Sequence, residues 1–82
     1  TDTMEKTTRF CFEKDPNPKV AIVFTGAMKP FGFEDSDATQ NFVEALMASQ
    51  LLSPGFYISF HGCIFKVPKV RKNHQTGTFE SF

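Results

Sequence analysis

Small and polar residues suited to ligand binding follow an apolar run in the first third of the chain. Thr25-Gly26-Ala27 comes directly after the continuous apolar stretch 20–24. Because glycine and alanine have little or no side chain, other groups can approach the backbone closely there. Ligands in open α/β sheets bind at the carboxyl ends of the strands. We therefore expect a ligand-accessible turn at residues 25–27.

A hydroxyl and a carboxylate stand side by side at Thr1 and Asp2. Such a pair in front of a helix is most often a cap, and Asp2 with Glu5 has the spacing of a capping box. Lys72 lies in a stretch with several other cations, which by itself is typical of a solvated surface. An N-terminal threonine can also use its own amine as a base, as in N-terminal-nucleophile hydrolases, although no other feature here favours that mechanism.

The histidines and cysteines show neither metal-ligand nor redox spacing. His61 and His74 lack a nearby Cys, Asp or Glu pattern, and Cys11 and Cys63 are far apart in apolar runs. We expect no metal site and no cofactor, and we interpret the two cysteines as reduced thiols in the core.

Hydrophobic periodicity and turn residues predict the elements that position these groups. Proline at positions 16 and 18 ends a first helix, and the sequence Ser53-Pro54-Gly55 ends a second. The polar tail 73–82 is expected to be weakly structured. The expected elements are a helix at about 3–13, a strand at 20–25, a helix at 37–50, and strands at 56–61 and 63–66.

Apolar residues indicate which faces are buried. On the first helix they are Met4, Thr8, Cys11 and Phe12, and on the second, capped by Ser36 or Asp37, they are Phe42, Val43, Leu46 and Met47. The run 20–24 is apolar without alternation, as in a strand covered on both faces, and predicts a central parallel strand.

Composition excludes several classes of function. The 82 residues have a formal net charge of zero, which gives little electrostatic attraction for nucleic acid or an anionic membrane. Hydrophobic residues make up 40% of the chain, near the globular average. We expect one small soluble, cytoplasmic α/β unit over 1–82, with two helices on a partial parallel sheet of Rossmann-like or flavodoxin-like type.

Several motifs occur in the order found in one enzyme family. The opening TDTMEKT resembles the TDTMEET segment of bacterial-type L-asparaginases, and TGAMKP at 25–30 resembles their TGAMRP turn. Asp37 and Asn41 match an SxDGxxN helix start, residues 55–58 resemble a GVYV strand, and Val70-Arg71-Lys72 resembles the segment with the catalytic lysine. Lys29 and Ala38 depart from the usual Arg and Gly. The resemblance covers nearly the whole chain and implies an internal, incomplete part of the N-terminal asparaginase domain.

The resemblance implies roles for particular residues. Thr1, Asp2 and Lys72 would form a catalytic relay, while Asp2 and Ala27 would bind the substrate, L-asparagine. The family's primary threonine nucleophile stands in a Gly-Gly-Thr segment, and these 82 residues contain no Gly-Gly pair. We therefore expect the isolated chain to be inactive, with a homo-oligomer or a full-length asparaginase as possible partner.

Two alternatives remain at this point. The chain can be a non-catalytic remnant that acts as a protein-interaction module, since an uncovered sheet edge invites strand addition. A small nucleic-acid binder using the basic stretch 66–72 is the weaker alternative because the net charge is zero.

Overall fold

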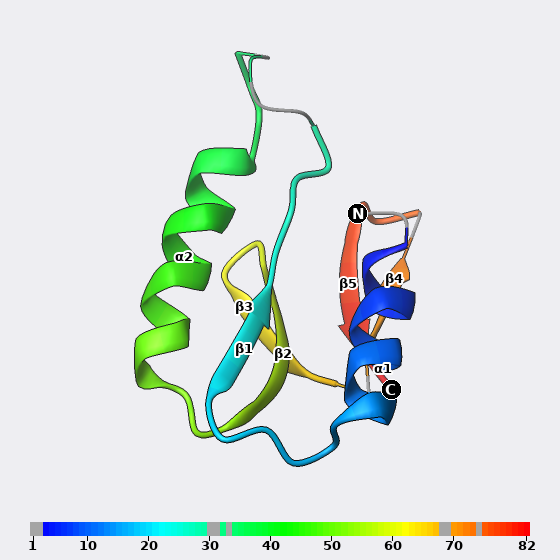
Figure 1. Cartoon of the computed structure of the whole chain (residues 1–82). Helices are drawn as coiled ribbons and strands as arrows, with labels where there is room; N and C mark the ends of the chain where they lie inside the picture. The colour runs from blue at the N-terminus through cyan, green and yellow to red at the C-terminus, as the bar shows by residue number, and fades with distance from the viewer. Residues whose placement is uncertain (1–2, 30–31, 33, 68–69, 74) are drawn as a thin grey trace.

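The computed structural model describes residues 3–29, 32, 34–67, 70–73 and 75–82. Over these residues the chain is α/β, as the sequence predicts, with helices and strands in the order shown in Figure 1. The elements are α1 (Met4–Lys14), β1 (Ala21–Phe24), α2 (Ala38–Leu51), β2 (Gly55–Phe60), β3 (Cys63–Lys66), β4 (Val70–Asn73) and β5 (Thr78–Ser81).

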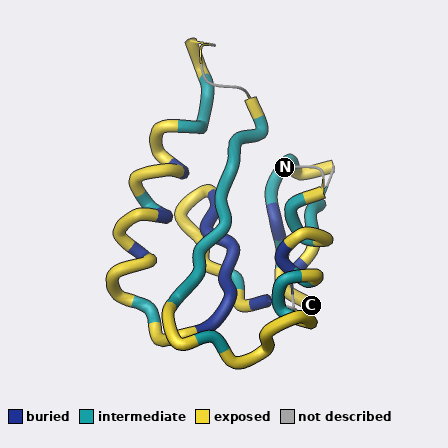
Figure 2. The backbone as a smooth tube through the Cα atoms, in the orientation of Figure 1, coloured by how far each residue is buried: buried dark blue, intermediate teal, exposed yellow. Residues whose placement is uncertain are grey.

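The main sheet has the order β1-β2-β3. β1 and β2 are parallel, with Ala21 opposite Gly55 and Phe24 opposite Ile58, and β3 returns antiparallel to β2. The prediction that β1 is the central strand is wrong, because β2 takes that place. Every residue of β2 is buried, whereas β1 is half-buried, since within the described residues it pairs with a strand on one side alone (Figure 2).

The two faces of this sheet are covered by different elements. α2 packs on one face against β1 and β2, while α1 and the β4–β5 pair lie on the other (Figure 1). The second side holds the core, in which alternate residues of β2 meet buried side chains from the following segments. The core cluster is Phe56, Ile58, Phe60, Val67, Val70 and Phe79.

α1 buries the face that the sequence predicts. Thr8 is fully buried, and Met4, Cys11 and Phe12 pack against the core. The N-cap position is Thr3, whose side chain makes no capping hydrogen bond. The predicted cap, Asp2, lies outside the described residues.

α2 docks through a different face from the predicted one. Its buried residues are Asn41, Ala45 and Ala48, whose small side chains allow the helix backbone to lie close to the sheet. The large apolar residues expected in the core are instead 47–62% exposed. They are Phe42, Val43, Leu46 and Met47, and Figure 2 shows much of α2 as exposed.

The described part of the tail forms regular structure, contrary to the prediction of a weakly structured segment. β4 and β5 form an antiparallel pair with Asn73 opposite Thr78. The Asn73 Oδ1 atom accepts hydrogen bonds from the backbone N–H of Gln75 and Thr76, and Gly77 takes a left-handed φ of 71° at the end of the loop. Phe79 then packs edge-on against Phe60 with ring centroids 5.0 Å apart, which attaches the pair to the core.

Both cysteines are free, but they are less buried than expected: Cys11 is half-buried and Cys63 is exposed. The prediction of two core thiols is therefore wrong for Cys63, which lies on β3 just after a turn. Neither described helix has the length and apolar character needed to cross a bilayer.

Candidate functional site

Polar groups converge where the parallel strands β1 and β2 end. Thr25 directly follows β1, and its hydroxyl donates a hydrogen bond to the backbone carbonyl of Ser59 on β2, at 2.7 Å. The chain then turns through residues 26–29, which overlap the small-residue segment 25–27 predicted to be accessible to a ligand. The N-terminal end of α2 contacts this segment through Asp37 and Asn41. The β2–β3 turn contacts Asp37 through His61.

The side chain of Asp37, the N-cap residue of α2, forms hydrogen bonds with the backbone of the 26–29 turn. One carboxylate oxygen accepts the N–H of Met28 and the other accepts the N–H of Lys29, each at 3.1 Å. Of the two caps considered from the sequence, Ser36 and Asp37, Asp37 makes no side-chain cap hydrogen bond, because its carboxylate is directed at the turn. The neighbouring Ser36 hydroxyl instead accepts the N–H of Ala38 at 3.1 Å.

Asn41, one helical turn after Asp37, connects three segments while being fully buried. Its amide nitrogen donates to the carbonyl of Gly26 at 2.9 Å and to the Asp37 carboxylate at 3.0 Å. Its side-chain oxygen accepts the backbone N–H of His61 at 3.0 Å. Because a buried amide without partners is costly, these three bonds fix the rotamer and the positions of all three segments.

His61 completes the group from the β2–β3 turn. His61 and Gly62 both have positive φ, 49° and 77°, as a two-residue type I′ turn requires. The imidazole Nε2 lies 2.6 Å from the Asp37 carboxylate, and its ring centroid lies 4.2 Å from that of Phe60. The N–H of Gly62 donates to the Glu44 carboxylate at 2.8 Å, which ties the same turn to α2 a second time.

The Asp37 carboxylate is held in its charged form. Partial burial, with 20% of the side chain exposed, would by itself raise its pKa. Hydrogen bonds from the Met28 N–H, His61 and the Lys29 N–H outweigh this desolvation and lower the pKa well below its usual range. Asp37 is therefore an acceptor, and not a proton donor, at neutral pH.

Two of the residues proposed from the sequence, Ala27 and Lys72, lie among the described residues, on different segments. Ala27 lies inside the turn held by Asp37 and Asn41, with Gly26 and Met28 anchored on either side of it. Lys72 lies on β4 opposite Phe79, half-buried, on the same strand face as the buried Val70.

The other two members of the predicted relay, Thr1 and Asp2, lie outside the described residues, as does His74. α1, which begins two residues after Asp2, contacts β4. No cluster of three or more potential metal-ligating side chains occurs within the part of the chain that the structure describes.

Sequence reasoning missed the role of His61, which it considered as a metal ligand alone. Its partner Asp37 is 24 positions away, so no local pattern joins them. One usable signal was present: a His-Gly pair between two apolar runs marks a two-residue turn, and such a turn lies near the end of the preceding strand.

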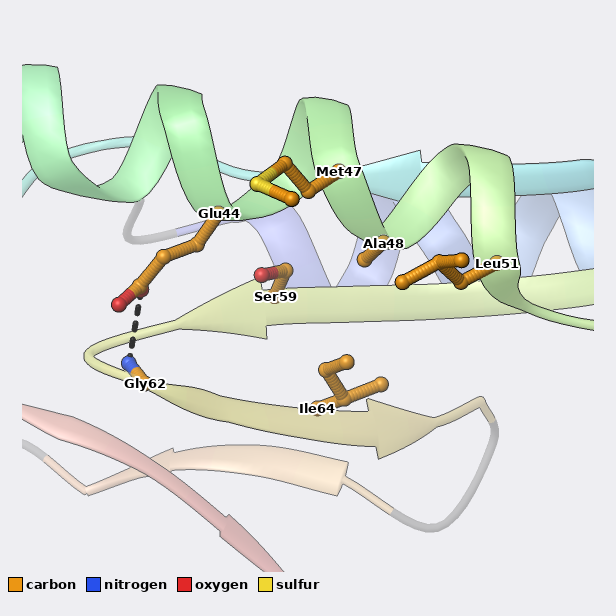
Figure 3. Close-up of a pocket in the computed structure, with 7 residues that line it drawn as sticks. All are labelled: Glu44, Met47, Ala48, Leu51, Ser59, Gly62 and Ile64. Carbon is orange, nitrogen blue, oxygen red and sulfur yellow. Dashed lines mark hydrogen bonds between the residues drawn. The ribbon is translucent and has the colours of Figure 1, made fainter.

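A separate groove of about 290 Å³ lies between α2 and the β2–β3 hairpin (Figure 3). Its wall is mostly apolar and includes neither Ala27 nor Lys72, and it borders the polar group around Asp37 through Glu44 and Gly62. The lining residues are Glu44, Met47, Ala48, Leu51, Ser59, Gly62 and Ile64.

Comparisons with known proteins agree with the motifs. The family model for the N-terminal part of asparaginase matches residues 1–82. An L-asparaginase from Thermococcus kodakarensis is 34% identical over 77 residues, which cover 94% of this chain and 24% of the relative. The chain thus spans about a quarter of the length of that relative. Because the family match extends over all 82 residues and agrees with the motif order, the chain belongs to the asparaginase family.

Proposed function

We propose that these residues contribute part of an asparaginase-type active site that hydrolyses L-asparagine to L-aspartate and ammonia. In this proposal Thr1, Asp2 and Lys72 form the relay, and the backbone at Ala27 contacts the substrate. The observation that supports it is the packing of α1 against β4, since Thr1 and Asp2 directly precede α1 and Lys72 lies on β4.

Each residue type suits its proposed task. A threonine hydroxyl is a weak nucleophile and proton donor until a neighbouring base takes its proton, and a lysine amine in its neutral form can be that base. The Asp2 carboxylate would balance the lysine's positive charge and bind the α-amino group of asparagine. The turn around Ala27 suits contact with the substrate's backbone-like groups because Asp37 and Asn41 hold it rigidly.

The relay alone does not complete the chemistry. The family's primary nucleophile stands in a Gly-Gly-Thr segment, and the 82 residues contain no Gly-Gly pair. Because nucleophile, base and oxyanion donors act as a unit, absence of one member removes a factor of about 10³ to 10⁶ in rate. We therefore propose that the isolated 82-residue chain is inactive and that its residues act together with further asparaginase segments.

A chimeric enzyme tests this proposal directly. The 82 residues replace the matched quarter of the Thermococcus kodakarensis L-asparaginase, and ammonia release from L-asparagine is measured. We expect activity in the chimera and none in the isolated chain. Thr1→Val, which keeps the side-chain shape but removes the hydroxyl, should lower kcat by about 10³, whereas Thr1→Ser should retain most of it.

Two results would reject the relay. One is a Thr1→Val chimera that keeps an ordinary rate, since the hydroxyl would then have no role. The other is a chimera that folds, as judged by circular dichroism and its oligomeric state, yet releases no ammonia. Ammonia release by the purified isolated chain would reject the need for a further nucleophile.

A second candidate function is a non-catalytic module that binds a longer asparaginase chain, for which the exposed apolar side of α2 provides the observation. Leu46, Met47 and Leu51 are 52%, 58% and 80% exposed, and Met47 and Leu51 border the groove in Figure 3. Apolar residues gathered in this way on one helix are typical of an interaction surface.

Binding to the Thermococcus enzyme, measured by calorimetry, tests this candidate. Leu46→Glu should abolish binding, whereas Phe10→Glu, the same kind of change at an exposed residue of α1, should not. Unchanged affinity in Leu46→Glu would exclude this surface. The two free cysteines suit a reducing, cytoplasmic location, and the zero net charge gives no support for nucleic acid or a membrane as partner.

A further inference from the structure

We propose that His61 is a positioning residue that acts through Asp37 to hold the 26–29 turn. The hydrogen bonds that connect the His61 imidazole to the turn pass through Asp37. The imidazole lies 2.6 Å from the Asp37 carboxylate, whose oxygens accept the N–H groups of Met28 and Lys29. The effect of His61 on substrate binding at Ala27 rests on the function proposed above. The effect of His61 on the position of the turn does not depend on that function.

The backbone that carries the imidazole is held independently of Asp37. The backbone N–H of His61 donates to the buried Asn41 side chain at 3.0 Å, and the next N–H, of Gly62, donates to Glu44 at 2.8 Å. The ring also packs against Phe60, which is fully buried. A side chain whose backbone is held at two adjacent N–H groups, and whose ring packs on a buried ring, can orient a carboxylate that would otherwise choose among several rotamers.

The backbone conformation of His61 indicates that its side chain has a role beyond forming the turn. A φ of 49° is strained for a residue with a Cβ atom, and a type I′ turn is most stable with Asn or Gly at this position. If the turn served only to reverse the chain, glycine would be the better residue here. Histidine combines tolerance of this conformation with a ring nitrogen that reaches Asp37 across the strand ends.

This reasoning provides a variant that separates the turn from the side chain. His61→Gly removes the imidazole but relieves the strained φ, so the hairpin should form at least as well as in the original chain. Asp37→Asn removes the charged acceptor. In a double-mutant cycle, a residue that acts through Asp37 should have little further effect once Asp37 has been replaced.

Amide hydrogen exchange by NMR on the 82-residue chain is the measurement. In His61→Gly we expect the Met28 and Lys29 amides to exchange about tenfold faster, which corresponds to the loss of one ordinary hydrogen bond. The Gly62 amide, bound to Glu44, is the internal control and should change by less than about twofold, and the melting temperature should not fall. On the Asp37→Asn background, His61→Gly should add less than about twofold.

The inference would be overturned if His61→Gly left the exchange rates of the Met28 and Lys29 amides unchanged. It would also be overturned if His61→Gly accelerated their exchange equally in the original chain and in Asp37→Asn. In the chimeric enzyme His61→Gly should raise KM for L-asparagine by about tenfold and change kcat by less than about twofold. An unchanged KM would refute the effect on substrate binding. A wild-type chimera without activity would refute the proposed function, while the exchange data would still decide the role of His61.

Discussion

Replacing Asn41 by aspartate probes the junction of α2, the 26–29 turn and the β2–β3 hairpin without changing side-chain volume. The Asn41 amide nitrogen donates to the Gly26 carbonyl at 2.9 Å and to the Asp37 carboxylate at 3.0 Å. In Asn41→Asp an acceptor oxygen faces these two acceptors. The two lost hydrogen bonds are worth about 2 kcal/mol together, at about 1 kcal/mol each.

Charge repulsion adds to this loss, but proton uptake limits it. Two carboxylates about 3 Å apart repel by about 5 kcal/mol at an effective dielectric constant of about 20. Protonating one carboxyl group of ordinary pKa at about pH 7 costs about 4 kcal/mol. The new side chain therefore takes up a proton, and the destabilisation from charge repulsion does not exceed this cost. The total destabilisation is therefore about 4 to 6 kcal/mol near pH 7, and it should shrink by about 2.7 kcal/mol near pH 5.

Urea unfolding followed by circular dichroism at the two pH values measures this effect. Stabilities of small domains run at about 0.05–0.15 kcal/mol per residue, or about 4 to 12 kcal/mol for 82 residues, so Asn41→Asp should lose a large part of the unfolding free energy near pH 7 and regain some of it near pH 5. Gln40→Glu is the matched control: the same chemical change on the same helix at an exposed position, with an expected effect below about 1 kcal/mol. A free energy of unfolding for Asn41→Asp within about 1 kcal/mol of the original chain near pH 7 would refute the account of Asn41.

Three further predictions concern acid stability, the core and the tail. The lowered pKa of Asp37 means that its carboxylate contributes stability that is fully present above about pH 4 and is lost as the pH falls through the folded-state pKa. The difference in unfolding free energy between the original chain and Asp37→Asn should therefore shrink on acidification, and a difference that grows toward low pH would contradict this. Phe79→Ala should cost about 3 to 5 kcal/mol in a urea titration because Phe79 is 3% exposed against Phe60, whereas Phe82→Ala, 56% exposed, should cost less than about 0.5 kcal/mol. Gly77→Ala should lower stability by about 1 kcal/mol in the same assay, because its φ of 71° is left-handed although the space around it is open, and an unchanged midpoint would refute the assigned turn geometry.

The α/β class and the parallel pair of strands could be predicted because they depend on local patterns. The apolar runs at 20–24 and 56–60 indicate buried strands, and the periodic segment between them is long enough for a crossover helix. The position of β1 in the sheet could not be predicted from a local pattern. Its apolar run suits a central strand, but strand order depends on neighbours that the run does not encode.

The buried face of α2 shows why periodicity alone is insufficient. The stripe Phe42, Val43, Leu46 and Met47 and the docked stripe Asn41, Ala45 and Ala48 have the same helical spacing, so a periodic pattern is compatible with either face. The structure selects the smaller side chains because they allow close approach to the sheet. The hydrogen bonds of Asn41 further stabilise this choice.

The strand end where the polar groups converge could be predicted, but the contacts that hold these groups could not. The small-residue exit of β1 marks the turn at 25–27, and the motif match draws attention to Asp37 and Asn41. The contact of His61 with Asp37 depends on where the β2–β3 hairpin lies relative to α2, which is a property of the folded chain. The ordered tail also depends on tertiary packing, because Phe79 attaches β5 to the core.

The role proposed for Lys72 in the relay is tested most directly by the kcat of two chimeric enzymes, Lys72→Met and Arg71→Met. The two residues are adjacent on β4, but Arg71 is exposed on the opposite strand face, so both changes remove one cation from the same strand. We predict that Lys72→Met lowers kcat for L-asparagine by about 10³ or more, and that Arg71→Met changes it by less than about threefold. Equal kcat values for the two variants would contradict the assignment of Lys72 as the base.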